Sequence, residues 1–199
     1  ARKFVVKNAL LNKLRSRIES LLEDIARRIL VTGITPNELT TMSLIIAISG
    51  YILITIYKLS FILSVTILFS GLLDAVDGAL ARVMNKTTRK GAFLDSFFDR
   101  LCEMFFTLSL IELGFDSRIV LLYLALAMLV SYARARGESL GVELSGVGLM
   151  ERAERLIALL LVSFIVGYDF IVAFYFFVAL TALTAFTVLQ RFVYLWKNL

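Results

Sequence analysis

The feature that most constrains this chain is a series of six apolar stretches, each about as long as a lipid bilayer is thick. Roughly 20 apolar residues are needed for a helix to cross the hydrocarbon core. The stretches cover residues 38–57, 61–83, 91–113, 118–140, 149–167 and 170–196. Apolar residues make up 59% of the 199 positions, above the share of about half that is usual in soluble domains. We therefore expect an all-α integral membrane protein with six transmembrane helices.

The first 36 residues have a different pattern and are expected to lie at the membrane surface. Leucine and isoleucine recur at steps of three and four residues, with charged residues between them. These apolar positions are Leu11, Leu14, Ile18, Leu21, Leu22, Ile25 and Ile29. The pattern is typical of an amphipathic interfacial helix, and a soluble helix packed on a partner protein is the alternative. We accordingly divide the chain into an interfacial helix with its linker, residues 1–36, and a six-helix membrane domain, residues 37–199.

Basic residues indicate how the helices are oriented. The breaks between the stretches are short, so neighbouring helices should run antiparallel, and six spans place both termini on one side. Of the 21 lysines and arginines, all except Lys58 and Arg118 then fall on that side. Lysine and arginine are enriched on the cytoplasmic side of membrane proteins. We expect a multi-pass protein of the cell membrane with both termini in the cytoplasm.

Four aspartates interrupt the apolar stretches. Asp74 and Asp77 lie near the end of the second stretch, and Asp95 and Asp99 lie near the start of the third. Charges at membrane depth are costly, so such residues are functional candidates. Residues three and four apart share a helix face, and the turn around residues 85–90 places both pairs at a similar depth. Carboxylates that face one another repel, and divalent cations relieve this repulsion. Oxygen-only ligands suit Mg²⁺ or Mn²⁺.

The absence of one residue type excludes several chemistries. The chain has no histidine and a single cysteine, Cys102. Zinc sites, histidine-based triads and an internal disulfide are therefore excluded. A general base must be a carboxylate, a lysine or a tyrosine. Cys102 itself is expected to be a small buried apolar residue.

The residues beside the aspartates fit a site for a phosphorylated ligand. Gly78, Ala79 and Ala81 are small and let a ligand approach the helix backbone. Arg82 lies one turn beyond Asp77, where it can pair with an anionic group. Two metal ions about 3.5–4 Å apart can bind the attacking and leaving oxygens of a phosphoryl displacement.

The segment between residues 74 and 99 resembles the signature of the CDP-alcohol phosphotransferases. It reads Asp74-Ala-Val-Asp77-Gly78-Ala-Leu-Ala81-Arg82, eight residues, Gly91, three residues, Asp95, three residues and Asp99. The six-helix layout with a preceding interfacial helix is similar to that family as well. The resemblance implies an enzyme of phospholipid biosynthesis that transfers a phospho-lipid group from a CDP-lipid to an alcohol.

The resemblance also implies roles for individual residues. Two divalent ions, Mg²⁺ or Mn²⁺, would be held by Asp74, Asp77, Asp95 and Asp99, and Asp99 would also be the catalytic base. The cytidine and diphosphate of the CDP-lipid would be contacted by Asn37, Thr40, Gly78, Ala81, Arg82 and Thr88. A homodimer is expected, and no nucleic-acid partner.

A second charged cluster flanks the fourth connection. Arg134 and Arg136 end the fourth stretch, and Arg152 and Arg155 begin the fifth. Arginine binds phosphate bidentately, so this cluster favours a phosphorylated acceptor. The alternative is ordinary cytoplasmic charge paired with nearby glutamates. Because Arg134 and Arg136 are two residues apart, they diverge on a continuous helix and converge only if the helix end unwinds or both side chains reach round.

The two segments around this cluster resemble the inositol-phosphate-accepting branch of the same family. They read Arg134-Ala-Arg136-Gly137-Glu138 and Gly148-Leu-Met-Glu151-Arg152-Ala-Glu-Arg155. The resemblance implies inositol 1-phosphate as the acceptor and CDP-archaeol or CDP-diacylglycerol as the donor. Arg134 and Gly137 depart from the lysine and alanine of the bacterial pattern, which favours the archaeal lipid. Two alternatives stay open: glycerol 3-phosphate as the acceptor, and a divalent-cation transporter, in which Arg82 would repel the cation.

Overall fold

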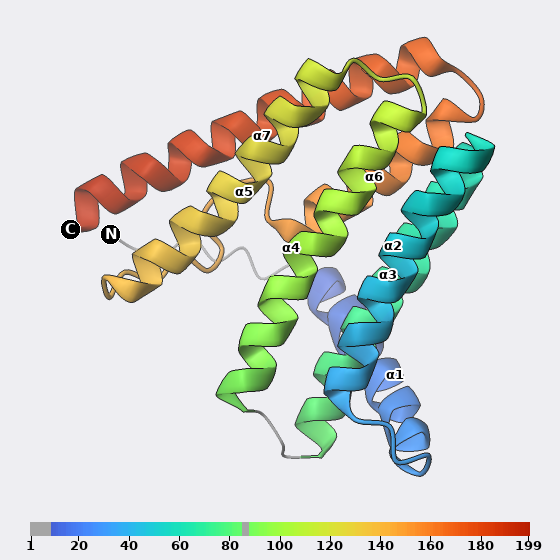
Figure 1. The fold of residues 1–199 in the computed structure, drawn as a ribbon. Coiled ribbons are helices and arrows are strands. Elements are labelled where there is room, and N and C mark those ends of the chain that lie inside the picture. The colour runs from blue at the N-terminus through green and yellow to red at the C-terminus, as the bar shows by residue number, and fades with distance from the viewer. Residues whose placement is uncertain (1–8, 85–87) are drawn as a thin grey trace.

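The computed structural model describes residues 9–84 and 88–199, and this part of the chain is helical without strands (Figure 1). Its helices are α1 (Ala9–Leu30), α2 (Pro36–Tyr57), α3 (Ser60–Val83), α4 (Arg89–Glu112), α5 (Ser117–Ser139), α6 (Arg152–Val166) and α7 (Phe170–Asn198). Four of the basic residues that were used for the orientation lie outside the described residues, namely Arg2, Lys3, Lys7 and Lys86. The all-α prediction is confirmed for the described part.

Four of the helices are long and apolar enough to cross a membrane: α2, α3, α5 and α7. Helix α4 is also 24 residues long, but charged residues such as Asp95 and Asp99 lower its hydropathy. Helix α6 has only 15 residues, about 22 Å at 1.5 Å per residue. The chain is therefore a membrane protein with four clear candidate spans.

The predicted stretches coincide with helices, and the fifth shows the largest difference. Five stretches match their helices to within two residues at each end, whereas the stretch 149–167 becomes a helix that starts only at Arg152. Gly146 and Gly148 have positive φ angles of 73° and 107°, which end any regular helix there. The backbone N–H of Met150 donates to the hydroxyl of Thr187 on α7 over 3.0 Å. This loop is therefore tied to α7 and does not extend α6.

Local capping sets where the helices that bear the site begin. Thr35 and Glu38 form a capping box at the start of α2, in which the backbone N–H of Thr35 donates to the Glu38 carboxylate over 2.7 Å. Thr88 caps α4 by accepting a 3.0 Å hydrogen bond from the N–H of Gly91. These caps satisfy backbone groups that a helix start leaves open. They hold the first turns of α2 and α4 beside the end of α3.

The described helices pack around a main apolar core, and a smaller one includes Ala26 of α1. Helices α2 and α3 form a hairpin that α4 contacts, α5 pairs with α7, and α6 packs between α3 and α7 (Figure 1). The core includes Phe106, Leu110, Tyr123, Leu159 and Phe177, all at most 2% exposed. Helix α1 packs on α3, with Ala26 fully buried. The helical pattern predicted within residues 1–36 is thus confirmed as α1, and its place in the interface stays a prediction.

The outer faces of the helices are apolar too. Large apolar side chains on them are more than 45% exposed, among them Ile45, Phe61, Phe69, Leu122 and Phe186. A water-soluble monomer does not expose so much apolar surface. Lipid tails account for it, which agrees with the membrane assignment.

Candidate active site

Three of the four aspartates converge between α3 and α4. One carboxylate oxygen from each of Asp74, Asp95 and Asp99 lies within 4.8 Å of the other two. Asp74 is on the last turns of α3, and the other two are on the first turns of α4. The spacing argument from the sequence therefore gave the right helix faces for these three residues.

Asp77 has a different environment. Its side chain is buried, with 4% of the residue exposed, and its Oδ2 accepts a 2.6 Å hydrogen bond from the hydroxyl of Thr40 on α2. It is not among the three aspartates that converge. Thr40, predicted to contact the donor, thus touches a predicted metal ligand directly.

The donor set fits a hard divalent cation. All three converging groups are carboxylates, which suit Mg²⁺ or Mn²⁺. Two oxygens on opposite sides of a Mg²⁺ ion are about 4.2 Å apart, from Mg–O distances near 2.1 Å. The 4.8 Å limit that encloses the three oxygens exceeds this only slightly. The carboxylate cluster can therefore hold a metal with small side-chain adjustments.

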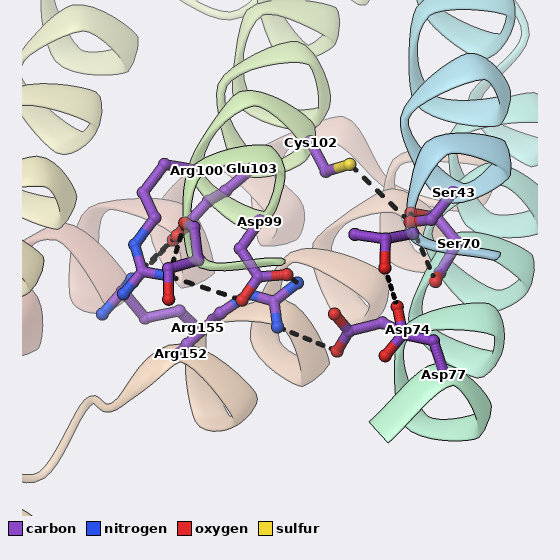
Figure 2. A network of polar contacts seen from close by, with 12 residues as sticks. Ser43, Ser70, Asp74, Asp77, Asp99, Arg100, Cys102, Glu103, Arg152 and Arg155 are labelled. Atoms are coloured by element: carbon purple, nitrogen blue, oxygen red, sulfur yellow. Dashed lines mark hydrogen bonds and ion pairs between the residues drawn. The ribbon is translucent and has the colours of Figure 1, made fainter. Parts of the chain in front are cut away.

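Arg152, the first residue of α6, contacts the carboxylates of α3 and α4, as Figure 2 shows. Its Nη1 donates to Asp74 over 2.9 Å, and its Nη2 lies 2.7 Å from Oδ1 of Asp99. Its Nε is buried and has no hydrogen-bond partner among the described residues. A second arginine, Arg100, lies 3.4 Å from the other oxygen of Asp99. These cations balance part of the negative charge of the cluster.

A cavity of about 450 Å³ opens on one side of the carboxylates. It collects every residue that the sequence assigned to the donor, and Asp77 and Asp95 form part of its wall. The donor candidates in its wall are Asn37, Thr40, Gly78, Ala81, Arg82 and Thr88. We refer to it as the donor pocket. Its position beside the aspartates suits a ligand whose phosphates lie against them.

Glycine at position 91 keeps this pocket open. A Cβ atom there would lie 3.1 Å from Oγ1 of Thr88 and 3.2 Å from Oδ1 of Asn37. Gly78 faces more space, since a Cβ atom there would meet only Nη1 of Arg82, at 3.6 Å. The tight approach of α2 and α4 at Gly91 explains why this position of the motif needs glycine.

A second cavity, of about 460 Å³, shares no lining residue with the donor pocket, and Asp74 forms part of its wall. Its lining carries five arginines from four helices: Arg100, Arg134, Arg152, Arg155 and Arg191. We refer to it as the basic pocket. Its excess of guanidinium groups over its acidic neighbours suits a phosphorylated ligand.

The structure does not bring the whole predicted arginine cluster together. Helix α5 continues through both positions as far as Ser139, so Arg134 and Arg136 diverge. Arg134 lines the basic pocket and pairs with Glu138 over 2.8 Å. Arg136 is exposed, contacts Ser139 and is not part of the pocket lining.

Arg100 and Arg191 line the basic pocket but were not among the predicted site residues, and Arg191 is the more deeply buried of the two. Arg191 was counted only as a cytoplasmic charge, yet it is 2% exposed and lines the basic pocket. Its guanidinium donates to the carbonyls of Val147 and Val130 and to the carboxylate of Glu151. A charged residue inside the last apolar stretch was the signal that could have identified it.

Cys102 is 2% exposed, as predicted. Its sulfur lies 3.7 Å from the hydroxyl of Ser43, which in turn lies 2.7 Å from the hydroxyl of Ser70. This small polar group joins α2, α3 and α4 close to the carboxylate cluster (Figure 2). These contacts hold the three helices together next to the carboxylate cluster.

Together these features describe a membrane protein with a carboxylate cluster that could hold a divalent ion and two cavities that each include a carboxylate of this cluster in their walls. The chain belongs to the CDP-alcohol phosphatidyltransferase family, whose sequence profile matches residues 33–189. Enzymes of this family transfer a phosphatidyl group from a CDP-lipid to an alcohol and release CMP, and the chain is an enzyme of this reaction class.

Several known proteins are similar to it over half or more of its length. The archaetidylinositol phosphate synthase of Aeropyrum pernix is 46% identical over 103 residues, 52% of this chain and only 53% of that protein. The enzyme with the same name from Pyrococcus horikoshii is 37% identical over 77% of this chain and 82% of that protein.

A solved structure has the same fold. The phosphatidylinositol phosphate synthase of Mycobacterium tuberculosis with CDP-DAG bound matches with a TM-score of 0.76 and 27% identity, covering 89% of this chain and 94% of that one. The same enzyme in complex with manganese and citrate matches with a TM-score of 0.78 and 28% identity, covering 88% of each chain.

Proposed function

We propose that this enzyme transfers the phospho-lipid group of a CDP-lipid to inositol 1-phosphate. The observation that carries the proposal is the basic pocket, a cavity separate from the donor pocket that has Asp74 of the carboxylate cluster in its wall. A donor and an acceptor in these two cavities would face each other across the aspartates. The names of the relatives from Aeropyrum pernix, Pyrococcus horikoshii and Mycobacterium tuberculosis agree with an inositol phosphate acceptor.

The charge of the basic pocket argues for a phosphorylated acceptor. Arg134 and Arg152 come from different helices and both line the cavity, so one phosphate can bind between them. Both arginines already have carboxylate partners, but the lining as a whole carries five arginines and only three acidic residues. A phosphorylated acceptor would balance this excess positive charge, whereas a neutral acceptor such as serine or free inositol would not. The phosphate would hold the acceptor with its hydroxyls directed at the carboxylate cluster.

Asp99 is positioned to accept the proton of the acceptor hydroxyl. One of its carboxylate oxygens lies within 4.8 Å of an oxygen of Asp74, which lines the basic pocket, and of an oxygen of Asp95, which lines the donor pocket. In the proposed reaction, the 3-hydroxyl of inositol 1-phosphate loses its proton to Asp99 and its oxygen attacks the lipid-side phosphorus. The bond from that phosphorus to the bridging oxygen breaks, and CMP leaves. Arg82 and Thr88, which line the donor pocket, would hold the nucleotide.

Asp74, Asp77, Asp95 and Asp99 are the residues that would hold the divalent ions. Bound Mg²⁺ or Mn²⁺ supplies charge stabilisation for a phosphoryl displacement. Three of the four carboxylates converge already, and Thr40 orients the fourth. Together the four carboxylates would supply the ligands for two ions.

The proposal extends to the lipid and to the membrane arrangement. The departures at Arg134 and Gly137 from the bacterial pattern favour CDP-archaeol over CDP-diacylglycerol as the donor. We propose that α4 and α6 cross the membrane along with the four clear spans, that residues 1–36 form the interfacial segment, and that both termini lie in the cytoplasm. A homodimer remains part of the proposal.

The decisive experiment is CMP release from purified enzyme with each CDP-lipid, Mg²⁺ or Mn²⁺, and a panel of acceptors. The panel contains inositol 1-phosphate, free inositol, glycerol 3-phosphate and serine. Release with inositol 1-phosphate alone, lost in Asp99→Asn, is the expected result. Preference for glycerol 3-phosphate would overturn the acceptor and keep the reaction. A divalent-cation transporter would show cation flux into vesicles and no CMP release.

A further inference from the structure

The buried ion pair between Arg155 and Glu103 lies at the wall of the basic pocket, which Arg155 helps to line. Nε of Arg155 lies 2.6 Å from Oε1 of Glu103, and Nη2 lies 2.8 Å from Oε2. The two side chains are 1% and 0% exposed. The third nitrogen, Nη1, donates to the carbonyl of Met150 over 3.1 Å. All three nitrogens of Arg155 are therefore engaged within the protein, which leaves this guanidinium poorly placed to bind a phosphate.

This pair forms the inner of two cross-links between the same two helices. Glu103 follows Asp99 by one turn on α4, and Arg155 follows Arg152 by one turn on α6. Residues three and four apart lie on one helix face. The outer cross-link, Asp99 to Arg152, borders the basic pocket, and the inner one is sealed from solvent (Figure 2). The inner pair thus fixes the position of the first turn of α6 relative to α4.

The same guanidinium also fixes the turn that precedes α6. Its bond to the carbonyl of Met150 holds the residue next to Glu151. Glu151 in turn accepts a 3.1 Å hydrogen bond from Arg191, and both of these residues line the basic pocket. A shift of Arg155 would therefore move Arg152 and the loop side of the pocket together.

Stability alone does not explain a charged pair at this position. Removing two charges from water is costly, and replacing a buried ion pair by apolar residues of similar volume is often neutral or stabilising. A bidentate guanidinium–carboxylate pair does, however, have a defined geometry. Groups that orient the residues of a site commonly change function about 10- to 100-fold when they are removed.

We propose that Arg155 and Glu103 are positioning residues that act through Arg152 and do not touch the substrate. They hold Arg152 at the distance from Asp99 and Asp74 at which it borders the acceptor. This inference rests on the proposed function, in that it takes the basic pocket to be the acceptor site. It also reassigns Arg155, which the sequence pattern placed among the phosphate ligands.

The test compares Glu103→Gln, Arg155→Lys and the apolar double variant Glu103→Met/Arg155→Met. For each we measure kcat, the KM of the donor, the KM of the acceptor and the thermal unfolding midpoint. Positioning predicts at least a tenfold rise in the acceptor KM for the double variant, with a donor KM within twofold of the wild type. Arg155→Lys keeps the charge but loses the bidentate geometry, so its acceptor KM should lie between that of the wild type and that of the double variant. Glu112→Gln, at the far end of α4, is the matched control.

Two results would overturn the proposal. If Arg155 bound the acceptor phosphate directly, every Arg155 variant would bind the acceptor weakly. Glu103→Gln, which frees the guanidinium, would then bind the acceptor as well as the wild type or better. A purely structural pair would lower the unfolding midpoint and leave the KM values of the folded fraction unchanged. If the double variant does not fold, the two single variants decide by the same comparison of KM values.

A binding measurement separates this proposal from the identity of the acceptor. Inorganic phosphate is titrated into the wild type and the three variants, and binding is measured by calorimetry. If the wild type releases no CMP with inositol 1-phosphate, the proposed acceptor is wrong, and the positioning role is then judged from phosphate binding. Phosphate affinity at least tenfold weaker in Glu103→Gln and in the double variant would uphold it, and unchanged affinity would overturn it.

Discussion

The guanidinium of Arg152 on α6 lies 2.7 Å from a carboxylate oxygen of Asp99 on α4. This contact joins the basic pocket to the carboxylate cluster, since Arg152 lines the pocket and Asp99 belongs to the cluster. A divalent ion held by the same carboxylates and the guanidinium are both cations, so they compete for the same negative charge. Metal binding and acceptor binding should therefore be coupled through Arg152, and such coupling is reciprocal.

Replacing Arg152 by alanine should affect the two ligands in opposite directions. Mn²⁺ should bind several-fold more tightly, because a competing cation is removed, and kcat/KM for the acceptor should fall by about 100-fold, in the range for a lost charged hydrogen bond. Titration calorimetry with Mn²⁺ and steady-state CMP release measure these two effects. Arg118→Ala, at the other end of the helices, serves as the control. Weaker Mn²⁺ binding in Arg152→Ala would show that the guanidinium organises the carboxylates and does not compete with the metal.

Thr40→Val should weaken the metal site without changing the shape of α2. The substitution removes the 2.6 Å hydrogen bond to Asp77 and keeps the branched side chain. We expect Mn²⁺ affinity and kcat/KM to fall by about tenfold, the lower end of the effect of groups that orient metal ligands. Thr41→Val is matched to it, because Thr41 is exposed and bonds only to the carbonyl of Asn37. If both variants lowered Mn²⁺ affinity and kcat/KM equally, the cause would be a change in helix α2 and not the lost hydrogen bond to Asp77.

The two arginines that end the fourth predicted stretch should differ in function. Arg134 lines the basic pocket, whereas Arg136 points away from it. We expect Arg134→Ala to raise the acceptor KM by about tenfold, and Arg136→Ala to raise it less than twofold. Initial rates of CMP release at varied acceptor concentration measure both. A larger effect at Arg136 would show that the acceptor lies outside the basic pocket.

Much of the site could be predicted because it depends on local geometry. The aspartates and the donor residues lie on or next to helices whose periodicity is visible in the sequence, and only a few residues separate the end of α3 from the start of α4. The carboxylates at 74, 95 and 99 converge for this reason, and the donor pocket collects all the residues assigned to it.

The remaining features depend on contacts between distant segments. Arg191 enters the basic pocket because α7 packs beside α5 and the loop before α6. The late start of α6 follows from the bond between Met150 and Thr187. The role of Arg155 depends on Glu103, 52 positions away. Periodicity indicates which face of a helix a residue occupies, but it does not indicate which partner that face meets.

Gly91→Ala should act on the donor and spare the acceptor. The new methyl group would lie 3.1 Å from Oγ1 of Thr88 and 3.2 Å from Oδ1 of Asn37, which is closer than ordinary carbon–oxygen contact. Both side chains line the donor pocket and must move by a few tenths of an ångström. We therefore expect the KM of the CDP-lipid to rise about three- to tenfold, while the acceptor KM stays within twofold.

The measurement varies each substrate in turn at saturating levels of the other. Ser96→Ala is the control on the same helix, because the Ser96 side chain is exposed and bonds only to the carbonyl of Ala92. A rise in both KM values would mean that the methyl group has displaced the carboxylate cluster as a whole. A donor KM equal to that of the wild type would show that the nucleotide does not use the part of the pocket between α2 and α4.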